Sequence, residues 1–322
     1  MKKFLKVLKN IIVVLCSLAL ILIVCVFFYH RIQLGKESEL LKGNGTLVKV
    51  NNQMLNVYRE GKGEDTYVFL SGSGVAAPMY EMKGLYSKFS EDNQIAVVER
   101  AGYGYSDQFD DKRDIDTILN QTRKALLDSG LKPPYILVPH SIAGVESIYW
   151  AQKYPDEVKG IIALDIGLPH EYVDHKMTWT EKLMIRGMNF LTDVGFSRLF
   201  PTLAYDPEVI NQDFLTKKEK EIFKAISFKQ FFNDNMMEEL LQVTANSKKS
   251  VSLDVPRETP ILFLSAYTDE NKNSKFTKEK NKNFNKIADK LQKSDVVKVK
   301  GKHSIYLYAP DEIYKNAIEF MN

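Results

Sequence analysis

Short apolar runs alternate with amphipathic stretches along the chain from residue 46 to its end. Eight of the runs have the length and composition of buried strands. This alternation predicts an α/β fold, in which a mostly parallel eight-stranded sheet carries helices on both faces. The predicted strands are 46–50, 54–58, 67–70, 95–98, 135–138, 161–164, 261–264 and 296–299, and the predicted helices between them are 79–89, 115–129, 142–153, 280–291 and 311–320.

The alternation stops between the sixth and seventh predicted strands. Residues of about 168–255 contain no strand pattern and are rich in Met, Phe and Leu at helical spacing. This stretch predicts a cap of helices inserted into the α/β domain, which would itself span 46–322. We expect most apolar side chains of the cap to form a small helical core, as a helical apolar pattern usually does. They include Met177, Trp179, Leu183, Met184, Met188, Phe190 and Leu191.

The longest apolar stretch lies near the N-terminus, at 11–29, and contains no charged residue. A helix of this length spans about 28 Å, which matches the hydrocarbon core of a bilayer. The stretch ends without the small residues of a signal-peptide cleavage site, so it predicts an uncleaved transmembrane anchor. Four lysines precede it, and this asymmetry favours a cytoplasmic segment 1–10 and an extracytoplasmic body at the cell membrane. Residues 30–45 are polar and predict a juxtamembrane linker.

Charge and cysteine content narrow the possible functions. The 322 residues carry a net charge of +3, but 1–31 contains five basic residues and no acidic one. The rest of the chain is therefore slightly acidic, which disfavours nucleic-acid binding. Both cysteines, Cys16 and Cys25, lie in the apolar stretch, so the body has neither a disulfide framework nor a thiolate metal site. The charge-dense run 272–282 predicts a solvated loop and helix start.

A candidate nucleophile lies between the fifth strand and the helix after it. The sequence Tyr-Ile-Leu-Val-Pro-His-Ser-Ile-Ala-Gly at 135–144 reads as a buried strand, a tight turn and a helix, with Ser141 on the turn. A serine hydroxyl becomes a useful nucleophile only when a base can remove its proton. A turn between strand and helix exposes the hydroxyl and directs the amides of the helix N-terminus at a developing oxyanion.

Other chemistry-bearing segments follow the remaining strands in a fixed order. A glycine-rich turn at 71–74 ends the third strand, and the sequence Glu-Arg-Ala-Gly-Tyr-Gly-Tyr-Ser at 99–106 follows the fourth. Asp269 follows the seventh strand, and His303 lies in a short loop after the last strand. The chain order is therefore serine, acid and histidine, which is the order of the α/β-hydrolase triad.

On these segments, residues 46–322 resemble the α/β-hydrolase superfamily, in the branch with a helical cap after the sixth strand. The turn at 71–74 resembles the oxyanion segment H-G-x-x, and 99–106 resembles D-R-x-G-x-G-x-S. The turn at 139–144 resembles G-H-S-x-G-G, and 301–304 is similar to the segment that carries the base of the family. Four residues depart from these motifs: Ser71, Glu99, Pro139 and Ala143.

The resemblance implies a serine hydrolase with Ser141 as nucleophile and His303 as base. We expect Asp269 to orient the imidazole, while Asp165, at the end of the sixth strand, stays an alternative because the position of the acid varies. The backbone N–H groups of Ser73 and Ile142 are the expected oxyanion donors. No cofactor is expected, and no metal site, because the remaining histidines lack a carboxylate–histidine pattern.

The expected reaction is hydrolysis of a carboxylic ester with an apolar part, since Met and Phe in the cap suit an adaptable apolar pocket. The expected partners are thus a small-molecule substrate and, through residues 11–29, the lipid bilayer. One alternative is an aminopeptidase of the proline-iminopeptidase kind, which would need acidic residues such as Glu238 and Glu239 near the mouth of the site. Another is a surface protein that binds a ligand without turning it over.

Overall fold

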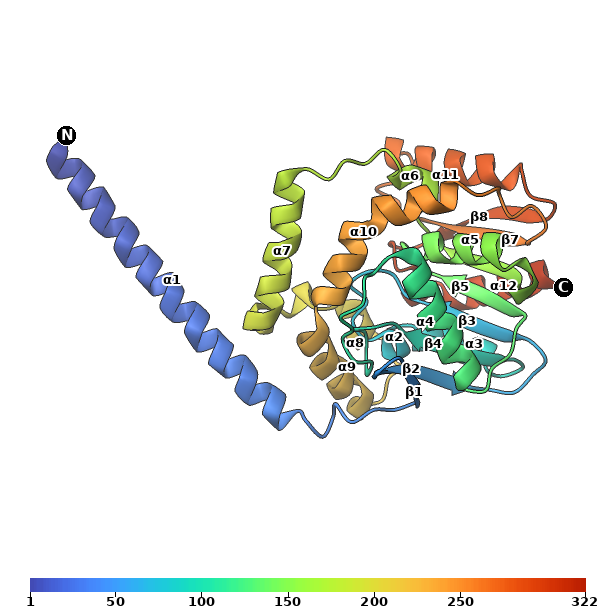
Figure 1. The fold of residues 1–322 in the computed structure, drawn as a ribbon, viewed down its shortest axis with the longest axis horizontal. Coiled ribbons are helices and arrows are strands. Elements are labelled where there is room, and N and C mark those ends of the chain that lie inside the picture. The colour runs from blue at the N-terminus through green and yellow to red at the C-terminus, as the bar shows by residue number, and fades with distance from the viewer.

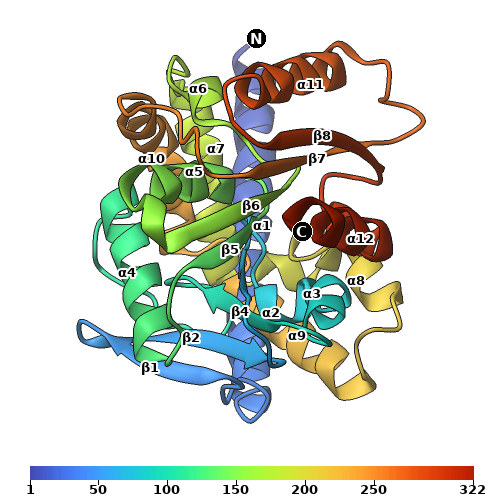
Figure 2. The same cartoon turned by 90° about the vertical axis from the view of Figure 1, so that its right-hand side faces the viewer.

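A single eight-stranded sheet organises the body of the protein, in the order β1-β2-β4-β3-β5-β6-β7-β8 (Figure 1, Figure 2). The computed structural model describes residues 1–322. Strand β2 runs antiparallel to both of its neighbours, and all pairs from β4 to β8 are parallel, which confirms the predicted sheet. The strands are β1 Thr46–Val50, β2 Gln53–Glu60, β3 Thr66–Leu70, β4 Gln94–Glu99, β5 Tyr135–Pro139, β6 Val158–Leu164, β7 Ile261–Tyr267 and β8 Ser294–Lys300.

Helices cover both faces of the sheet, and each face has its own apolar core. Trp150 and Phe263 belong to the core under α4, α5 and α11, whereas Phe69 and Phe89 belong to the core under α3 and α12. Strands β3 and β5 are buried at every position, which explains why they read as continuous apolar runs. The helices of the body are α2 Pro78–Glu81, α3 Lys83–Phe89, α4 Ile115–Asp128, α5 Ala143–Lys153, α11 Lys275–Ala288 and α12 Pro310–Met321, with the 3₁₀ turns η1 Pro155–Glu157 and η4 Ile305–Leu307.

Between β6 and β7 the chain forms a helical cap over the end of the sheet (Figure 1). Met177 and Met188 pack against the buried Tyr103 and Phe232, so part of the predicted cap core exists. The expectation fails for four of its apolar residues, which are exposed: Trp179, Leu183, Met184 and Phe190. The elements of the cap are α6 Pro169–Tyr172, α7 Trp179–Val194, η2 Phe196–Arg198, η3 Pro201–Leu203, α8 Pro207–Asn211, α9 Lys217–Gln230 and α10 Asp234–Val251.

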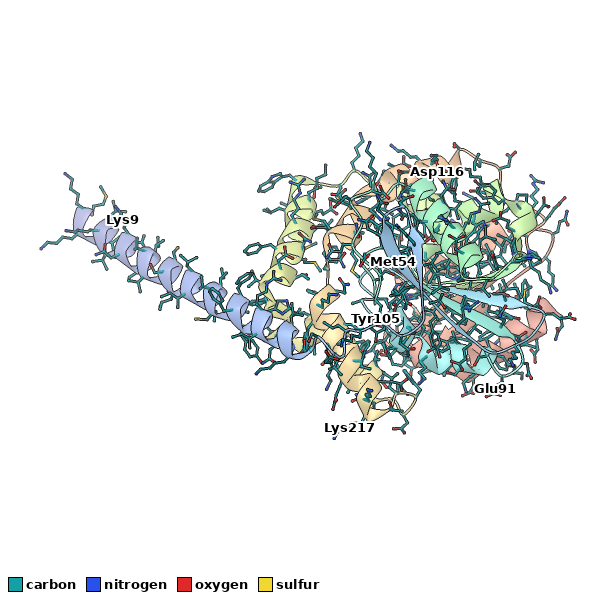
Figure 3. The ribbon with its side chains drawn as sticks, turned by 60° about the horizontal axis from the view of Figure 1, so that its bottom comes forward. Lys9, Met54, Glu91, Tyr105, Asp116 and Lys217 are labelled. Atoms are coloured by element: carbon teal, nitrogen blue, oxygen red, sulfur yellow. The ribbon has the colours of Figure 1, made fainter.

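The N-terminal helix α1, Lys2–Lys36, projects from the body, and most of its side chains contact no other part of the chain (Figure 3, where Lys9 marks its far end). Only Val26 and His30 are buried in it. The helix is long and apolar enough to cross a membrane. It continues beyond the expected span into residues 30–36, so the first part of the predicted linker is helical rather than irregular.

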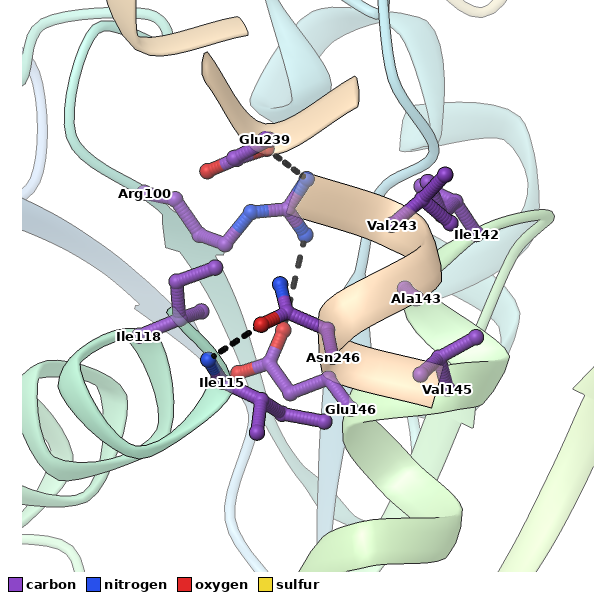
Figure 4. A pocket seen from close by; sticks show the side chains of 10 residues that line it. All are labelled: Arg100, Ile115, Ile118, Ile142, Ala143, Val145, Glu146, Glu239, Val243 and Asn246. Atoms are coloured by element: carbon purple, nitrogen blue, oxygen red, sulfur yellow. Dashed lines mark hydrogen bonds and ion pairs between the residues drawn. The ribbon is translucent and has the colours of Figure 1, made fainter. Parts of the chain in front are cut away.

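A buried ion cluster joins the cap to the body (Figure 4). The carboxylate of Glu239 on α10 accepts hydrogen bonds from Arg100 at 3.2 Å and Arg113 at 3.0 Å, and from the hydroxyl of Tyr103 at 2.8 Å. Burial alone would raise the pKa of Glu239, but the two guanidinium groups outweigh it, and the pKa lies below its ordinary value. Arg100 also donates to the carbonyl of Ser71 at 2.8 Å, so the cluster reaches the turn after β3.

We expect Glu239→Ala to lower the free energy of unfolding by about 3–5 kcal/mol, because it leaves the buried Arg113 without a counter-ion and Arg100 with only Glu146, at 3.7 Å. Chemical denaturation of the purified chain in detergent measures this change. The adjacent, partly exposed Glu238 provides a matched control, and Glu238→Ala should change the midpoint little. Equal effects of the two substitutions would show that the cluster does not hold the cap in place.

Candidate active site

Ser141 lies on a sharp turn between β5 and α5, with φ of 56°. This left-handed conformation is uncommon for a residue other than glycine, and such strain is concentrated at functional sites. The departures from glycine at Pro139 and Ala143 are accommodated because the close approach occurs at Gly144. A Cβ added to Gly144 would lie 2.6 Å from the Cβ of Ile166, in the segment after β6. The turn thus keeps the one glycine that its packing requires.

Three side chains form a continuous hydrogen-bonded chain at this turn. The Nε2 atom of His303 lies 2.8 Å from the hydroxyl oxygen of Ser141. The other ring nitrogen, Nδ1, lies 2.7 Å from a carboxylate oxygen of Asp165. An imidazole that donates from Nδ1 to a carboxylate presents an unprotonated Nε2, which can accept the serine proton. The arrangement has the geometry of a nucleophile, a general base and an orienting acid.

Asp165 follows β6 directly and is held by donors from three separate elements. Besides the bond to His303, its second oxygen accepts the backbone N–H of Ala266 at 2.8 Å and the ammonium of Lys280 at 2.5 Å. Burial raises the pKa of Asp165, but the bond to His303 and the charge of Lys280 outweigh it, so the pKa lies below its usual value. Asp165 is therefore an anion throughout the neutral range. Its own φ of 44° is also left-handed.

The prediction that Asp269 orients the imidazole is wrong, and the alternative Asp165 occupies that position. The carboxylate of Asp269 is exposed and pairs with Lys300 at 2.6 Å and Lys272 at 3.6 Å. The register explains the error: Leu164 pairs with Leu264, so Asp165 is level with residue 265 of β7. Asp269 lies four residues beyond that level, in a turn past the end of β7 at Tyr267.

Lys280 is the residue of the site that sequence reasoning missed. We expected the run 272–282 to be solvated, but the side chain of Lys280 is only 10% exposed. It also donates to the carbonyl of Ala266 at 3.0 Å, so it fixes both the acid and the strand beside it. Spacing could have indicated this orientation. Lys280 is three residues after Thr277 and four before Phe284, and these two are the buried residues of α11.

The turn at 71–74 lies against the nucleophile. A Cβ added to Gly72 would be 2.8 Å from the Cβ of Ser141, so only glycine allows the two backbones to come so close. Ser73 and Ser141 line the same cavity. The backbone N–H groups of Ser73 and Ile142, the two predicted oxyanion donors, donate to no group within the protein. Neither N–H group is therefore engaged within the protein, as the role of an oxyanion donor requires.

The neighbouring His140 supports the loop that carries His303. Its Nε2 donates to the carbonyl of His303 at 3.2 Å, and the two rings lie 4.6 Å apart between centroids. Burial, and then the proximity of His303, lower the pKa of His140 to about 3. The ring is therefore neutral at physiological pH and packs against His303 as an uncharged group. No group of three His, Cys, Asp or Glu side chains is placed to hold a metal ion.

Two cavities meet at the hydroxyl of Ser141. One lies between the segment after β6 and helix α11, and is lined by Tyr172 and Phe276 among others. The other lies under the cap segment 202–207, where Leu203 and Tyr205 form part of its wall. His303 also lines both cavities, so both open onto the same pair of side chains.

Comparison with known proteins reveals a full-length relative and many structural neighbours. The uncharacterized protein YbdG of Bacillus subtilis is 57% identical over 321 residues, which cover all of this chain and 99% of YbdG. Among solved structures, ALR0039 of Nostoc sp. PCC 7120, described as an α/β hydrolase, aligns with a TM-score of 0.64 and 13% identity over 88% of this chain and 99% of its own. The thioesterase domain of the curacin biosynthetic pathway aligns with a TM-score of 0.59 and 13% identity over 86% of this chain and 99% of the domain. No protein-family model matches the chain.

The geometry predicts opposite outcomes for the two candidate acids. Asp165→Asn should lower kcat/KM by about two to four orders of magnitude, because an amide at this position favours the wrong tautomer of the histidine. Asp269→Asn should leave kcat/KM nearly unchanged, because it removes only exposed ion pairs. Steady-state kinetics on a chromogenic ester compare the variants. A large loss of kcat/KM in Asp269→Asn, together with a nearly unchanged kcat/KM in Asp165→Asn, would contradict the assignment.

Lys280→Met should move the acid limb of the pH–rate profile to higher pH, by about half a unit or more. The variant removes a positive charge that lowers the pKa of Asp165, and so favours protonation of the hydrogen-bonded group to which this carboxylate belongs. The measurement is kcat/KM between pH 5 and 9. Lys280→Arg keeps the charge and should keep the limb in place, whereas a Lys278→Met control alters an exposed lysine of the same helix. A Lys280→Met profile of unchanged shape would limit Lys280 to a structural role.

Proposed function

Because this chain belongs to the family of Bacillus subtilis YbdG and has the α/β-hydrolase fold, we propose that it is a membrane-anchored serine hydrolase that cleaves carboxylic esters. The observation that carries the proposal is the hydrogen-bonded chain from Ser141 through His303 to Asp165. Each link is within normal hydrogen-bond distance, and the nucleophile opens onto two cavities. An enzyme of this fold that uses serine in this way needs no cofactor.

In the proposed reaction, His303 removes the proton of Ser141 while the hydroxyl oxygen attacks the ester carbonyl. The N–H groups of Ser73 and Ile142 stabilise the oxyanion, and a donor of this kind contributes about 3–4 kcal/mol to the barrier reduction in a serine protease. His303 then protonates the departing alkoxide, which leaves an acyl group on Ser141. Water repeats the sequence: His303 activates it, and it releases the acid and restores the serine.

The acyl chemistry rests on the groups that surround the nucleophile. Serine, a histidine base and two free backbone donors suit a tetrahedral intermediate at a carbonyl carbon. The thioesterase domain among the structural neighbours, by its name, also acts on an acyl substrate. The two cavities are lined mainly by polar residues, and Leu203 in one and Phe276 in the other offer contacts for an apolar part of the substrate.

The aminopeptidase alternative has less support. The two acids that the sequence offered to hold a substrate amine do not serve: Glu239 is buried between two arginines, and Glu238 lines neither cavity of Ser141. A protein that only binds a ligand is also less favoured, because it would have no need for the short bonds on both nitrogens of His303.

We also propose that α1 anchors the enzyme as a single membrane span at 11–29, with a cytoplasmic N-terminus and an extracytoplasmic catalytic domain. Its 35 residues form one continuous helix whose apolar side chains are exposed. Such a surface is unfavourable in water and favourable in lipid. The four lysines before the span support the orientation.

The direct test of the enzymatic proposal is labelling of the full chain with a fluorophosphonate probe, which reacts with activated serines. Wild type should be labelled and should hydrolyse p-nitrophenyl esters, whereas Ser141→Ala should lose both activities and keep its unfolding midpoint. Ser147→Ala, at a fully buried serine of the following helix α5 that lines neither cavity, should retain labelling. Undiminished labelling of Ser141→Ala would refute the proposal.

A further inference from the structure

The outer side of helix α7 carries large apolar side chains that no part of the chain covers. Trp179 is 74% exposed, Leu183 55%, Met184 62% and Phe190 54%. Trp179, Leu183 and Phe190 are separated by four and seven residues, so they form one stripe along the helix. Isolated exposed apolar residues are ordinary, but a contiguous set of this size marks an interaction surface.

Further exposed apolar residues follow α7 in the segment of the turns η2 and η3. Leu199, Phe200 and Leu203 are exposed there as well. Together with the four residues on α7 they form what we call the α7–η3 surface. The basic residues Lys182 and Arg186 border the stripe on α7, with Asp193 near the end of the helix. Aromatic and basic side chains around an apolar stripe are typical of a helix that lies in a membrane interface.

The membrane anchor is docked beside this surface. The Nε atom of Arg198 on η2 donates to Nδ1 of His30 at 2.8 Å, and its two terminal nitrogens bind the carboxylate of Glu37 at 2.8 and 2.6 Å. At the end of α7, Gly195 has φ of 77°, and a Cβ there would lie 2.2 Å from the ring of His30. The last turns of α1 therefore bind the cap through close and specific contacts.

This contact determines what the α7–η3 surface faces. The proposed span ends at residue 29, and His30, the next residue, is the one buried against Gly195 and Arg198. The C-terminal end of α7 must therefore lie at the boundary of the bilayer that holds α1. Helix α7 lies between α1 and the body (Figure 1), so its uncovered side is next to the anchor. The bilayer is the apolar partner that this position provides.

The surface also connects to the reacting serine. Leu203 is exposed on the surface and, with the segment up to residue 207, lines the cavity that contains Ser141 and His303. The cavity therefore begins at the α7–η3 surface, and Leu203 is the apolar residue that the two share. A substrate held at this surface would reach Ser141 and His303 past Leu203.

We propose that the α7–η3 surface rests in the interface of the bilayer, and that the substrate is a lipid ester that enters the site directly from the membrane. The inference rests on the proposed membrane-anchored hydrolase and assigns its substrate class. The anchor and the cap then act together: α1 fixes the distance of the enzyme from the bilayer, and α7 turns the mouth of the site toward it.

Trp179 can serve as an intrinsic fluorescent probe of the α7–η3 surface, because the chain contains only two tryptophans and the other, Trp150, is completely buried. The full chain is reconstituted into nanodiscs that hold one copy each, with phosphatidylcholine brominated on its acyl chains. Bromine quenches only an indole in contact with the lipid. We expect quenching of the wild-type fluorescence and none in Trp179→Phe.

Absence of quenching, with Trp179 open to aqueous iodide, would overturn the proposal. Shielding of Trp179 only where several copies share a membrane would also overturn it, since a second copy would then be the partner.

Kinetics test the route of the substrate. The double variant Leu183→Glu with Phe190→Glu should hydrolyse a fluorogenic phosphatidylcholine ester in vesicles about tenfold more slowly or worse, since two apolar side chains no longer enter the lipid. Its rate on a water-soluble butyrate ester should stay at the wild-type level. Leu127→Glu, at an exposed leucine of α4, should alter neither rate. An equal rate of the double variant and wild type on the vesicle ester would refute entry from the membrane.

The two proposals fail in distinguishable ways. If the protein is not a serine hydrolase, the fluorophosphonate will not label Ser141 and the soluble butyrate ester will not be hydrolysed. If labelling and soluble turnover are present while brominated lipid leaves Trp179 unquenched, the enzyme is a serine hydrolase whose cap does not touch the bilayer.

Discussion

The buried carboxylate of Asp165 is the interaction on which the geometry of the site depends. Three donors converge on it, from the loop after β8, from β7 and from α11, and so it fixes the relative positions of three elements. A buried anion is costly unless each lone pair is used, and here the donors satisfy that requirement. The same contacts hold the ring of His303 in line with Ser141. Stability and the proposed chemistry therefore depend on one charge.

A second buried charge links the site to the cap. Glu239 joins the cap helix α10 to Arg100, and Arg100 binds the carbonyl of Ser71 in the turn that carries a proposed oxyanion donor. At the other end of the cap, Arg198 binds the last turns of α1. The cap is thus tied both to the reacting atoms and to the membrane helix. This connectivity explains how an insertion without a sheet of its own keeps a defined position.

The sequence allowed most of the fold to be predicted, because strands buried on both faces are continuous apolar runs and the turn at Ser141 follows one of them. The acid of the site was assigned incorrectly because its position depends on register. Only the pairing of Leu164 with Leu264 reveals that Asp269 lies too far along. Lys280 belongs to a lysine-rich run that is otherwise typical of a solvated segment. Only its helical spacing from Thr277 and Phe284, which are buried, indicates that its side chain points inward. The exposure of Trp179 could not be predicted either, since helical apolar spacing describes a core and a membrane surface equally well.

The central claim is that Ser141 forms a covalent acyl intermediate with the help of His303 and Asp165. Rapid acid quenching of the enzyme during turnover of a p-nitrophenyl ester, followed by mass spectrometry of its peptides, tests this claim most directly. The account predicts that the peptide containing Ser141 gains the mass of the acyl group within the first turnover, and that fragmentation assigns it to this serine. Steady hydrolysis of the ester with no acylated peptide, or with the acyl group on a different residue, would contradict the account.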